Sequence, residues 1–394
     1  MNNAENWLCW EWKCKTNLKI FAMGVIQIFW RMKTLDAIVI GAGFVGVATA
    51  MKLRRSGLKN ILIVEQGSWP FQRASTYNQS RVHRGYHYPR NIETAMYAAT
   101  SYEQFIREYA QAIIPGTESY YVIARDSKTS SEEFLTFCKT LNAPIYDITR
   151  DRKHHFNMEK IETVFRVEEA FFDPYMMYKI LADRSEGMGI KLQVNTKVEE
   201  VIDAGSHLIV SGPGFKAAAG IVVNASYSGI NKIKGFVPDF SNEIKYELAE
   251  IAHVEAPKEY MNKAYTIIDG PYFSLTPRSN TKYHNLSHVT HTPRAEVVDT
   301  GNGEELLDEG YTSNVEEMIA DAATYMPSLE TSIPRGSHYE TKVILTKHEE
   351  DDGRPMVIKS LDSRSFSILG GKIDSISSGV LDGFARRLSL GDRL

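Results

Sequence analysis

A ten-residue segment, RVHRGYHYPR at positions 81–90, contains three arginines, two histidines and two tyrosines. The chain of 394 residues has a formal net charge of −4, so this cluster of cationic side chains is local and does not reflect the overall composition. Guanidinium groups pair with carboxylates and phosphates, often through two parallel hydrogen bonds. The segment therefore indicates a site for one or more anions, with a solvated basic loop as the alternative.

Within this segment His83 is the candidate for proton transfer, because an imidazole titrates near neutral pH. A structural hydrogen bond is the alternative role for the ring. If the segment is extended, positions 81, 83 and 87 face one way, and positions 84, 86, 88 and 90 face the other. One face can then serve a cofactor and the other a substrate.

The stretch AIVIGAGFVG, from Ala37 to Gly46, predicts a buried strand that leads through a glycine turn into a helix. In the G-x-G-x-x-G pattern the first glycine allows a tight turn, the second admits a pyrophosphate, and the third lets helix and strand pack closely. The matching residues are Gly41, Gly43 and Gly46. A second apolar strand, Ile61–Val64, leads to Glu65, about 20 residues beyond the glycines, where a carboxylate can bind an adenosine ribose. This order of features predicts a dinucleotide-binding unit, and Glu65 favours FAD or NAD over NADP.

Composition narrows the class of protein further. A net charge near zero argues against nucleic-acid binding, which normally requires a basic face. The three cysteines, Cys9, Cys14 and Cys138, form no CxxC pair, which favours a reducing compartment and predicts a cytoplasmic protein. Residues 1–32 precede the first strand and are predicted to be an N-terminal extension, with a membrane-associating segment as the alternative. Their apolar run IFAMGVIQIFW is shorter than the roughly 20 residues that span a bilayer, so no integral membrane span is expected.

Three further segments resemble the D-amino-acid oxidase family, the DAO-type FAD-dependent oxidoreductases. The first, VEEAFFDPYMMYKILADRSEGMGIKLQVNTKVEEVI at 167–202, is similar to a helix–strand unit of that family and implies that the backbone of Val198 lies against the adenine. The second, GIVVNAS at 220–226, resembles a strand end that lies beside the flavin and implies a flavin contact from Ala225.

The third segment, ILGGKIDSISSGVLDGFARRL at 368–388, has a double glycine that opens a helix, and the resemblance implies that the N-terminus of this helix faces the flavin. The residues expected to contact FAD here are Gly370, Gly371, Lys372 and Ile373. Lys372 is a candidate for stabilising negative charge on the reduced flavin, and an exposed lysine at the start of a helix is the alternative.

The basic segment and its flank, ASTYNQSRVHRGYHYP, resemble the N-S-G-x-I-H-x-G-x-Y-Y segment of the L-2-hydroxyglutarate oxidase branch, with Asn78, His83, Gly85 and Tyr88 at matching positions. In that branch the loop passes the flavin and the pyrophosphate, which implies that Asn78 binds the cofactor. Ser80 and Arg81 depart from the pattern, so the resemblance does not identify the substrate. The expected catalytic residues are Arg81, His83 and Lys372, and the expected substrate-binding residues are Arg81, Arg84, His87, Tyr88 and Tyr272.

The resemblance implies an α/β fold in which a Rossmann-type FAD-binding domain is interleaved with a sheet-rich, α+β substrate domain. The expected FAD-binding domain comprises residues 33–120, 168–232 and 341–394. The expected substrate domain comprises residues 121–167 and 233–340.

The expected activity is that of an FAD-dependent oxidoreductase that takes a hydride from a C–H bond beside an amine or hydroxyl of a small anionic substrate to flavin N5. FAD is expected to bind without a covalent link, because the C-terminal flavin region contains no cysteine. The electron acceptor, oxygen or a quinone, is not defined by the sequence. Two alternatives stay open: a non-redox flavoenzyme such as a sugar-nucleotide mutase, and an FAD-binding protein without catalysis.

A second group of histidines, His284, His288 and His291, raises the question of a metal site. Their spacing fits no standard zinc pattern. On a strand, positions 284 and 288 share a face that position 291 does not. The sequence therefore predicts no metal site, and pocket or surface histidines are the expected roles.

Overall fold

The predicted dinucleotide-binding unit forms the centre of the first of two β-sheets. In the computed structural model, which describes residues 34–298, 305–307, 310–348 and 353–390, β1 (Leu35–Ile40) is parallel to β2 (Ile61–Val64). The two strands are joined through α1 (Phe44–Arg55). The last four residues of β1 and all four of β2 are buried, as expected for parallel strands covered on both faces. The predicted N-terminal extension, with Cys9 and Cys14, lies outside the described residues.

The first sheet collects strands from separate stretches of the chain. Its order is β12-β9-β10-β11-β1-β2-β8, and β20 pairs with both β11 and β19. Strands β1, β2, β11 and β20 run in the same direction, so their carboxyl ends meet at one edge. The remaining strands are β8 (Lys191–Gln193), β9 (Glu200–Asp203), β10 (Leu208–Gly212), β11 (Phe215–Asn224), β12 (Lys234–Gly235), β19 (Val357–Ser360) and β20 (Ser365–Leu369).

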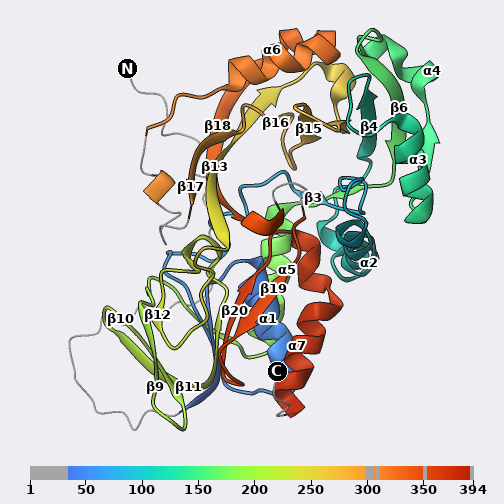
Figure 1. Cartoon of the computed structure of the whole chain (residues 1–394). Coiled ribbons are helices and arrows are strands. Elements are labelled where there is room, and N and C mark those ends of the chain that lie inside the picture. The colour runs from blue at the N-terminus through green and yellow to red at the C-terminus, as the bar shows by residue number, and fades with distance from the viewer. Residues whose placement is uncertain (1–33, 299–304, 308–309, 349–352, 391–394) are drawn as a thin grey trace. The chain divides into compact units, whose positions relative to one another are not determined.

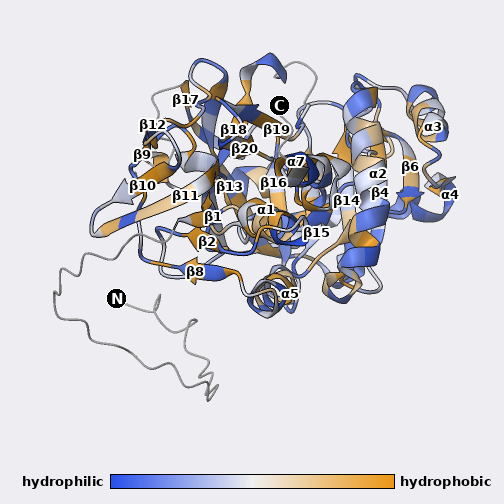
Figure 2. Cartoon of the chain, turned by 90° about the horizontal axis from the view of Figure 1, so that it is seen from below, coloured by the Kyte–Doolittle hydropathy of each residue, from blue (hydrophilic) through white to orange (hydrophobic). Residues whose placement is uncertain are grey.

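Helices α1, α5 (Pro174–Gly187) and α7 (Gly379–Leu390) pack together beside this sheet (Figure 1). Asp173 caps α5 by accepting hydrogen bonds from backbone N–H groups of its first turn, and proline occupies the first position of the helix. Helix α2 (Ile92–Glu108) follows the basic segment. In Figure 2 the strands around α1 include hydrophobic stretches, and α2 carries both hydrophobic and hydrophilic residues.

The second sheet has the order β17-β13-β16-β15-β14-β4-β6-β5, with β18 paired to β13. Figure 1 shows it above the first sheet, with α6 (Val315–Tyr325) over β16 and β18. Its strands are β4 (Glu118–Ala124), β5 (Ile145–Asp147), β6 (Ile161–Val167), β13 (Ile244–Glu255), β14 (Lys263–Ile268), β15 (Phe273–Pro277), β16 (His284–His288), β17 (Pro293–Val298) and β18 (Ile333–Leu345). Helices α3 (Ser131–Thr140) and α4 (Thr149–Arg152) lie in the connections around β4, β5 and β6.

Short 3-10 helices occupy many of the connections. They are η1 (Ala110–Ala112), η2 (Lys153–His155), η3 (Tyr227–Gly229), η4 (Lys258–Tyr260), η5 (Glu305–Leu307), η6 (Pro327–Thr331), η7 (Thr346–His348) and η8 (Ile373–Ser377). Among the described residues, no helix is long and apolar enough to cross a membrane.

The predicted fold class, a Rossmann-type α/β arrangement with a second, sheet-rich part, is confirmed. The described residues from Thr34 onward belong to one compact unit that contains both sheets. The expected limits at 120/121 and 340/341 fall inside β4 and β18, which lie wholly in the second sheet because their partner strands are there.

Candidate active site

A cavity of about 1060 Å³ lies between the two sheets. One side is formed by the ends of β1, β2 and β20 and by the residues after β11, and the other side by β13, β14, β15 and β18. Open α/β sheets bind ligands beyond the carboxyl ends of their parallel strands, which is where this cavity lies. The predicted cofactor residues that line it are Gly41, Gly43, Glu65, Asn78, Val198, Ala225, Gly370, Gly371, Lys372 and Ile373.

The glycine turn leaves room that side chains would fill. A Cβ on Gly46 would lie 2.0 Å from the carbonyl oxygen of Gly41, so Gly46 serves the packing of α1 on the turn and does not line the cavity. Gly41 has a φ of +98°, and its added Cβ would lie 2.7 Å from the oxygen of Ala225. Gly43 does line the cavity, and its added Cβ would meet only Ser75 Oγ, at 3.1 Å. This narrow, glycine-lined approach to a helix N-terminus fits the pyrophosphate of FAD.

Glu65 is held in place by backbone donors. Its Oε2 accepts a hydrogen bond from Ala42 N at 2.8 Å, and its Oε1 accepts one from Gly67 N at 2.7 Å. The carboxylate is therefore fixed at the end of β2 on the cavity wall. Each carboxylate oxygen can accept further hydrogen bonds, so the residue retains the capacity to bind a ribose.

Asn78 shapes the loop before the basic segment. Its Nδ2 donates to the carbonyl oxygens of Ala74 and Ser75 at 2.9 and 3.0 Å, and its Oδ1 accepts from Ser80 N at 2.7 Å. These bonds close the loop on itself beside the cavity, so the side chain acts on any cofactor mainly through the loop that it holds.

The double glycine after β20 leads into the cavity wall, but the helix that follows differs from the prediction. Residues Ile373–Ser377 form the short 3-10 helix η8, and the α-helix α7 begins only at Gly379. Ser378 between them has an extended backbone, with φ −73° and ψ 149°, which interrupts the helix. The helix that follows Gly370 and Gly371 is therefore only the five-residue 3-10 helix η8, with Lys372 at its N-cap.

The basic segment is extended over only two residues, and this corrects the predicted alternation of faces. Strand β3 (Arg81–Val82) pairs with β7 (Ala170–Phe171), and the chain then turns at Gly85, whose φ is +102°. Because of this turn, Tyr88 lines the cavity, whereas Arg84 does not.

Arg84 is bound by surface carboxylates instead. Its Nη2 donates to Glu103 at 2.7 Å, its Nη1 donates to Glu168 at 2.8 Å, and its guanidinium lies over the ring of Tyr102. Glu103 and Glu168 are more than half exposed. The substrate-binding role expected for Arg84 therefore has no support from its position.

We expect Arg84→Ala to leave the FAD content and the kinetics with the true substrate unchanged. Exposed ion pairs of this kind contribute about 1 kcal/mol or less, so the free energy of unfolding should also change little. Flavin absorbance per protein, steady-state rates and a denaturant titration check this. A rise in KM would show that Arg84 does contribute to substrate binding.

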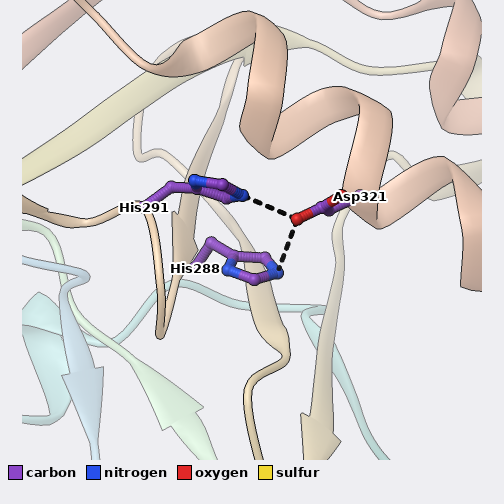
Figure 3. A group of neighbouring side chains, drawn as sticks. All are labelled: His288, His291 and Asp321. Atoms are coloured by element: carbon purple, nitrogen blue, oxygen red, sulfur yellow. Dashed lines mark hydrogen bonds and ion pairs between the residues drawn. The ribbon is translucent and has the colours of Figure 1, made fainter.

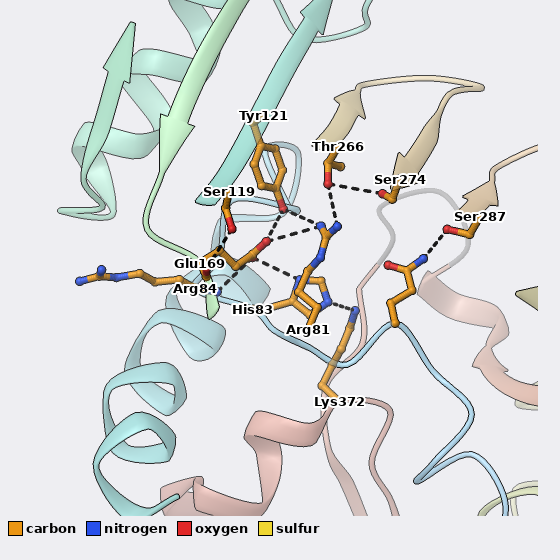
Figure 4. A network of polar contacts seen from close by, with 11 residues as sticks. Arg81, His83, Arg84, Ser119, Tyr121, Glu169, Thr266, Ser274, Ser287 and Lys372 are labelled. Carbon is orange, nitrogen blue, oxygen red and sulfur yellow. Dashed lines mark hydrogen bonds and ion pairs between the residues drawn. The ribbon is translucent and has the colours of Figure 1, made fainter. Parts of the chain in front are cut away.

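Arg81, His83 and Lys372 come together beside the cavity (Figure 4). Lys372 Nζ lies 3.1 Å from His83 Nε2. Burial lowers the pKa of His83, and the charges of Lys372 and Arg81 lower it further. Burial also lowers the pKa of Lys372, with a second contribution from Arg354, while Asp374 opposes the shift. The His83 ring is therefore neutral near neutral pH, and the lowered pKa of Lys372 makes its neutral amine accessible there as a proton acceptor.

Arg81 is anchored by the second sheet. Its Nη2 donates to Thr266 Oγ1 at 2.7 Å, and its Nη1 donates to Tyr121 Oη at 3.2 Å. The same Nη1 lies 3.5 Å from Glu169 Oε2, and both side chains are almost fully buried. These three contacts engage both terminal nitrogens of the guanidinium, whereas Arg81 Nε is buried without a hydrogen-bond partner among the described residues.

Sequence reasoning missed three buried groups at this site. Arg354 lines the cavity, and its Nη1 is buried without a hydrogen-bond partner among the described residues. Asp374 is 1% exposed, and burial raises the pKa of its carboxyl. Glu169 is the second residue of an acidic pair in the sequence, after Glu168. No local pattern identified any of the three, because each depends on contacts between distant segments.

The remaining predicted substrate residues lie on the cavity wall. His87 and Tyr88 line it. The His87 ring is exposed on the cavity wall, and the protein that encloses the cavity, followed by the charge of His83, lowers its pKa. Tyr272 also lines it and donates its hydroxyl to Asp126 at 2.8 Å. At the same rim Arg90 Nε donates to Asp269 at 2.8 Å.

The second histidine group divides in a way that the sequence did not predict. His284 Nε2 bonds to the carbonyl oxygen of Tyr260, so this ring is structural. The turn after β16 brings His291 back beside His288 (Figure 3). His291 Nε2 lies 2.6 Å from Asp321 Oδ2, and His288 Nε2 lies 3.8 Å from the same oxygen. The expectation that His291 points away from His288 is therefore wrong.

The proton on His288 bears on whether this group can hold a metal. Thr290 N–H donates to His288 Nδ1 at 3.1 Å, which places the proton of the neutral ring on Nε2. A metal would need that nitrogen free. The geometry accordingly favours a hydrogen-bonded histidine–aspartate cluster that ties α6 to the turn after β16.

FAD is expected to leave the protein on denaturation. Cys138 is fully buried in an apolar cluster of the second sheet, and burial raises the pKa of its thiol to about 12. It does not line the cavity. We predict that acid precipitation releases the yellow colour into the supernatant. Colour that stays with the precipitated protein would show a covalent link.

The chain matches the profile of the DAO family, described as FAD dependent oxidoreductase, over residues 36–371. It is 24% identical over 345 residues to the FAD-dependent monooxygenase FPY4 of Fusarium mangiferae, covering 86% of this chain and 87% of that protein.

Among solved structures, glycine oxidase from Geobacillus kaustophilus superposes with a TM-score of 0.69 at 16% identity, covering 91% of this chain and 95% of that one. L-alpha-glycerophosphate oxidase from Mycoplasma pneumoniae, solved with FAD bound, gives the same TM-score, identity and coverage. The glycine turn, the fixed Glu65 and the cavity at the carboxyl ends of the strands agree with the cofactor of this family. The chain belongs to the DAO family of FAD-dependent oxidoreductases.

Proposed function

We propose that this enzyme oxidises a small anionic substrate by removing a hydride from a C–H bond beside an amine or a hydroxyl group and passing it to flavin N5. The observation that carries the proposal is the pair of cationic side chains, Arg354 and Lys372, on the wall of the cavity beside the double glycine. Arg354 Nη1 is buried and lacks a partner among the described residues, so an anionic ligand would satisfy it. When bound, FAD supplies the two-electron acceptor.

The protein residues then have separate tasks. Arg354 is assigned to binding, because its guanidinium can hold a carboxylate or a phosphate through charge-assisted hydrogen bonds. Lys372 is assigned to proton transfer, because burial lowers its pKa and so makes the neutral amine accessible near neutral pH. Tyr88, beneath the Lys372 ammonium at 5.1 Å, helps to exclude water from this side of the cavity.

The names of the structural neighbours support both kinds of reacting group. Glycine carries an amine beside the C–H bond and glycerophosphate carries a hydroxyl, and each also has an anionic group, a carboxylate or a phosphate. Neither identity exceeds 16%, so the neighbours do not select between an amino acid and a hydroxy acid. The resemblance of the loop around His83 to the L-2-hydroxyglutarate oxidase branch keeps hydroxy acids among the candidates.

Anaerobic reduction tests this proposal. Purified holoenzyme is mixed with a panel of amino acids, hydroxy acids, phosphorylated polyols and uncharged polyols, and bleaching of the flavin band is recorded. We expect at least one anionic compound to bleach the flavin, and we expect Arg354→Met to raise its KM about tenfold or more, consistent with the loss of a charge-assisted contact. Arg84→Met is the matched control. Bleaching only by uncharged polyols, or an unchanged KM in the Arg354 variant, would contradict the anionic substrate.

A further inference from the structure

Glu169 is a buried carboxylate that the proposed chemistry leaves without a role. It follows β6, and its side chain is only 1% exposed. Its Oε2 accepts a hydrogen bond from Tyr121 Oη at 3.1 Å and lies 3.5 Å from Arg81 Nη1. Burying a carboxylate costs several kcal/mol unless it is paired, so Arg81 explains why the charge is tolerated but not what it does.

The other oxygen of Glu169 accepts a hydrogen bond from Arg84 N at 3.4 Å and also faces the active-site histidine. His83 Nδ1 lies 3.6 Å from Glu169 Oε1 and has no hydrogen-bond partner among the described residues. His83 Nε2 lies 3.1 Å from Lys372 Nζ. A protonated lysine donates only, so Nε2 accepts and the proton of the neutral ring lies on Nδ1, on the side of Glu169. Lys372, His83 and Glu169 thus form a continuous line that leads away from the main cavity (Figure 4).

A second cavity of about 260 Å³ lies at the far end of this line. Glu169 belongs to its lining, whereas His83 and Lys372 belong to the lining of the main cavity. Thr117 also lines it, and the Oγ1 of Thr117 is buried without a partner among the described residues. The volume is enough for several water molecules at roughly 30 Å³ each, and water would satisfy this hydroxyl. Glu118 also lines the second cavity and is exposed, so the cavity reaches the protein surface at this residue.

We propose that Lys372, His83 and Glu169 carry the proton released by the oxidation out of the main cavity, with Glu169 as the last acceptor before the water of the second cavity. The inference rests on the proposed function. The substrate loses a hydride with its electron pair to the flavin and loses one proton from its amine or hydroxyl.

That proton is accounted for at each atom. Neutral Lys372 Nζ takes it from the substrate and passes a proton to His83 Nε2, and the Nδ1 proton of His83 moves to Glu169 Oε1. Glu169 releases a proton to water, and tautomerisation of the neutral imidazole returns its remaining proton from Nε2 to Nδ1. One proton reaches solvent for each hydride transferred, and the net charge of the buried line is the same before and after the cycle.

Glu169→Gln separates a proton acceptor from a merely orienting residue. Glutamine keeps an oxygen that can face His83 Nδ1 as the carboxylate does, but it cannot take up the proton. We expect the rate of anaerobic flavin reduction to fall about tenfold or more, with unchanged FAD content and KM, because loss of a proton-transfer group acts on the rate. We also expect the solvent deuterium isotope effect on that rate to change. Glu103→Gln, which removes an exposed carboxylate that pairs with Arg84, is the control and should match the wild-type enzyme.

The outcomes are distinct for the relay and for the function that it serves. A wild-type enzyme that no anionic substrate reduces overturns the proposed function itself. A wild-type enzyme that is reduced, together with a Glu169→Gln variant that keeps the full rate and the same isotope effect, overturns the relay alone. A variant that changes only KM shows that Glu169 orients the site and does not accept a proton.

The single variant leaves Arg81 buried without its carboxylate and can therefore fail to fold. In that case the double variant Arg81→Gln/Glu169→Gln, which removes both charges together, is compared with Arg81→Gln. The relay predicts a slower flavin reduction in the double variant than in Arg81→Gln. Equal rates in these two proteins overturn it.

Discussion

Gly43→Val is expected to yield a folded protein without FAD. Gly43 has an ordinary extended backbone, with φ −76° and ψ 178°, so valine adopts the conformation without strain. The nearest atom to an added Cβ is Ser75 Oγ at 3.1 Å, and the rest of the side chain would enter the cavity at the N-terminus of α1. The helix terminus would keep its partial positive charge but lose the space through which a pyrophosphate reaches it.

The measurement is the ratio of flavin absorbance to protein, together with the far-UV spectrum of the variant. Gly383→Ala is the control, because an added Cβ at this α7 position meets no atom within 4 Å. We expect the control to keep a full complement of FAD. Retention of FAD by Gly43→Val would show that the pyrophosphate binds elsewhere. An altered far-UV spectrum would show a role in folding, for which the geometry at Gly43 gives no reason.

The central unit of the fold was predictable because its signals are local. The continuous apolar runs of β1 and β2, the glycine spacing between them and the acidic residue after β2 lie within about 30 residues, as in any βαβ unit of this kind. The start of α5 also depends on neighbouring residues alone, because Asp173 caps it and a proline follows directly.

The charged core of the site was not predictable in this way. Arg81 could be identified as unusual, but its partner Glu169 is brought to it by the pairing of β3 with β7 and of β4 with β6. The side chains of Tyr121 and Thr266 meet Arg81 only because β14 lies parallel to β4. Arg354 and Lys372 likewise share the cavity only once β19 and β20 have joined the first sheet.

Two local errors show where periodicity fails. Alternation along residues 81–90 assumed a strand, but the positive φ of Gly85 ends the extended backbone and separates Arg84 from Tyr88. The same assumption misplaced His291, because a turn directly after β16 reverses the chain and returns the ring to His288. In both segments turn geometry decided which side chains meet, and a period of two residues carries no information about a turn.

Lys372→Met is expected to slow anaerobic flavin reduction by about 10²-fold or more, the usual range for the loss of a general base. Methionine preserves most of the apolar length of lysine, so the buried packing against Tyr88 should be retained. FAD content should stay whole, because the glycine turn and Glu65 that fit the cofactor lie elsewhere on the cavity wall.

The pH profile gives the decisive test of the lysine. Burial and Arg354 lower the pKa of Lys372, so in the wild-type enzyme the neutral amine gains population as pH rises through that lowered pKa. The reduction rate should therefore rise with pH and reach a plateau, and Lys372→Met should remove this rise. Lys359→Met is a matched control, because Lys359 bonds to Asp239 and Glu243 and does not line the cavity. If Lys372→Met is slow but keeps the wild-type pH profile, another group accepts the proton, and Lys372 contributes only its charge to the binding of the anion.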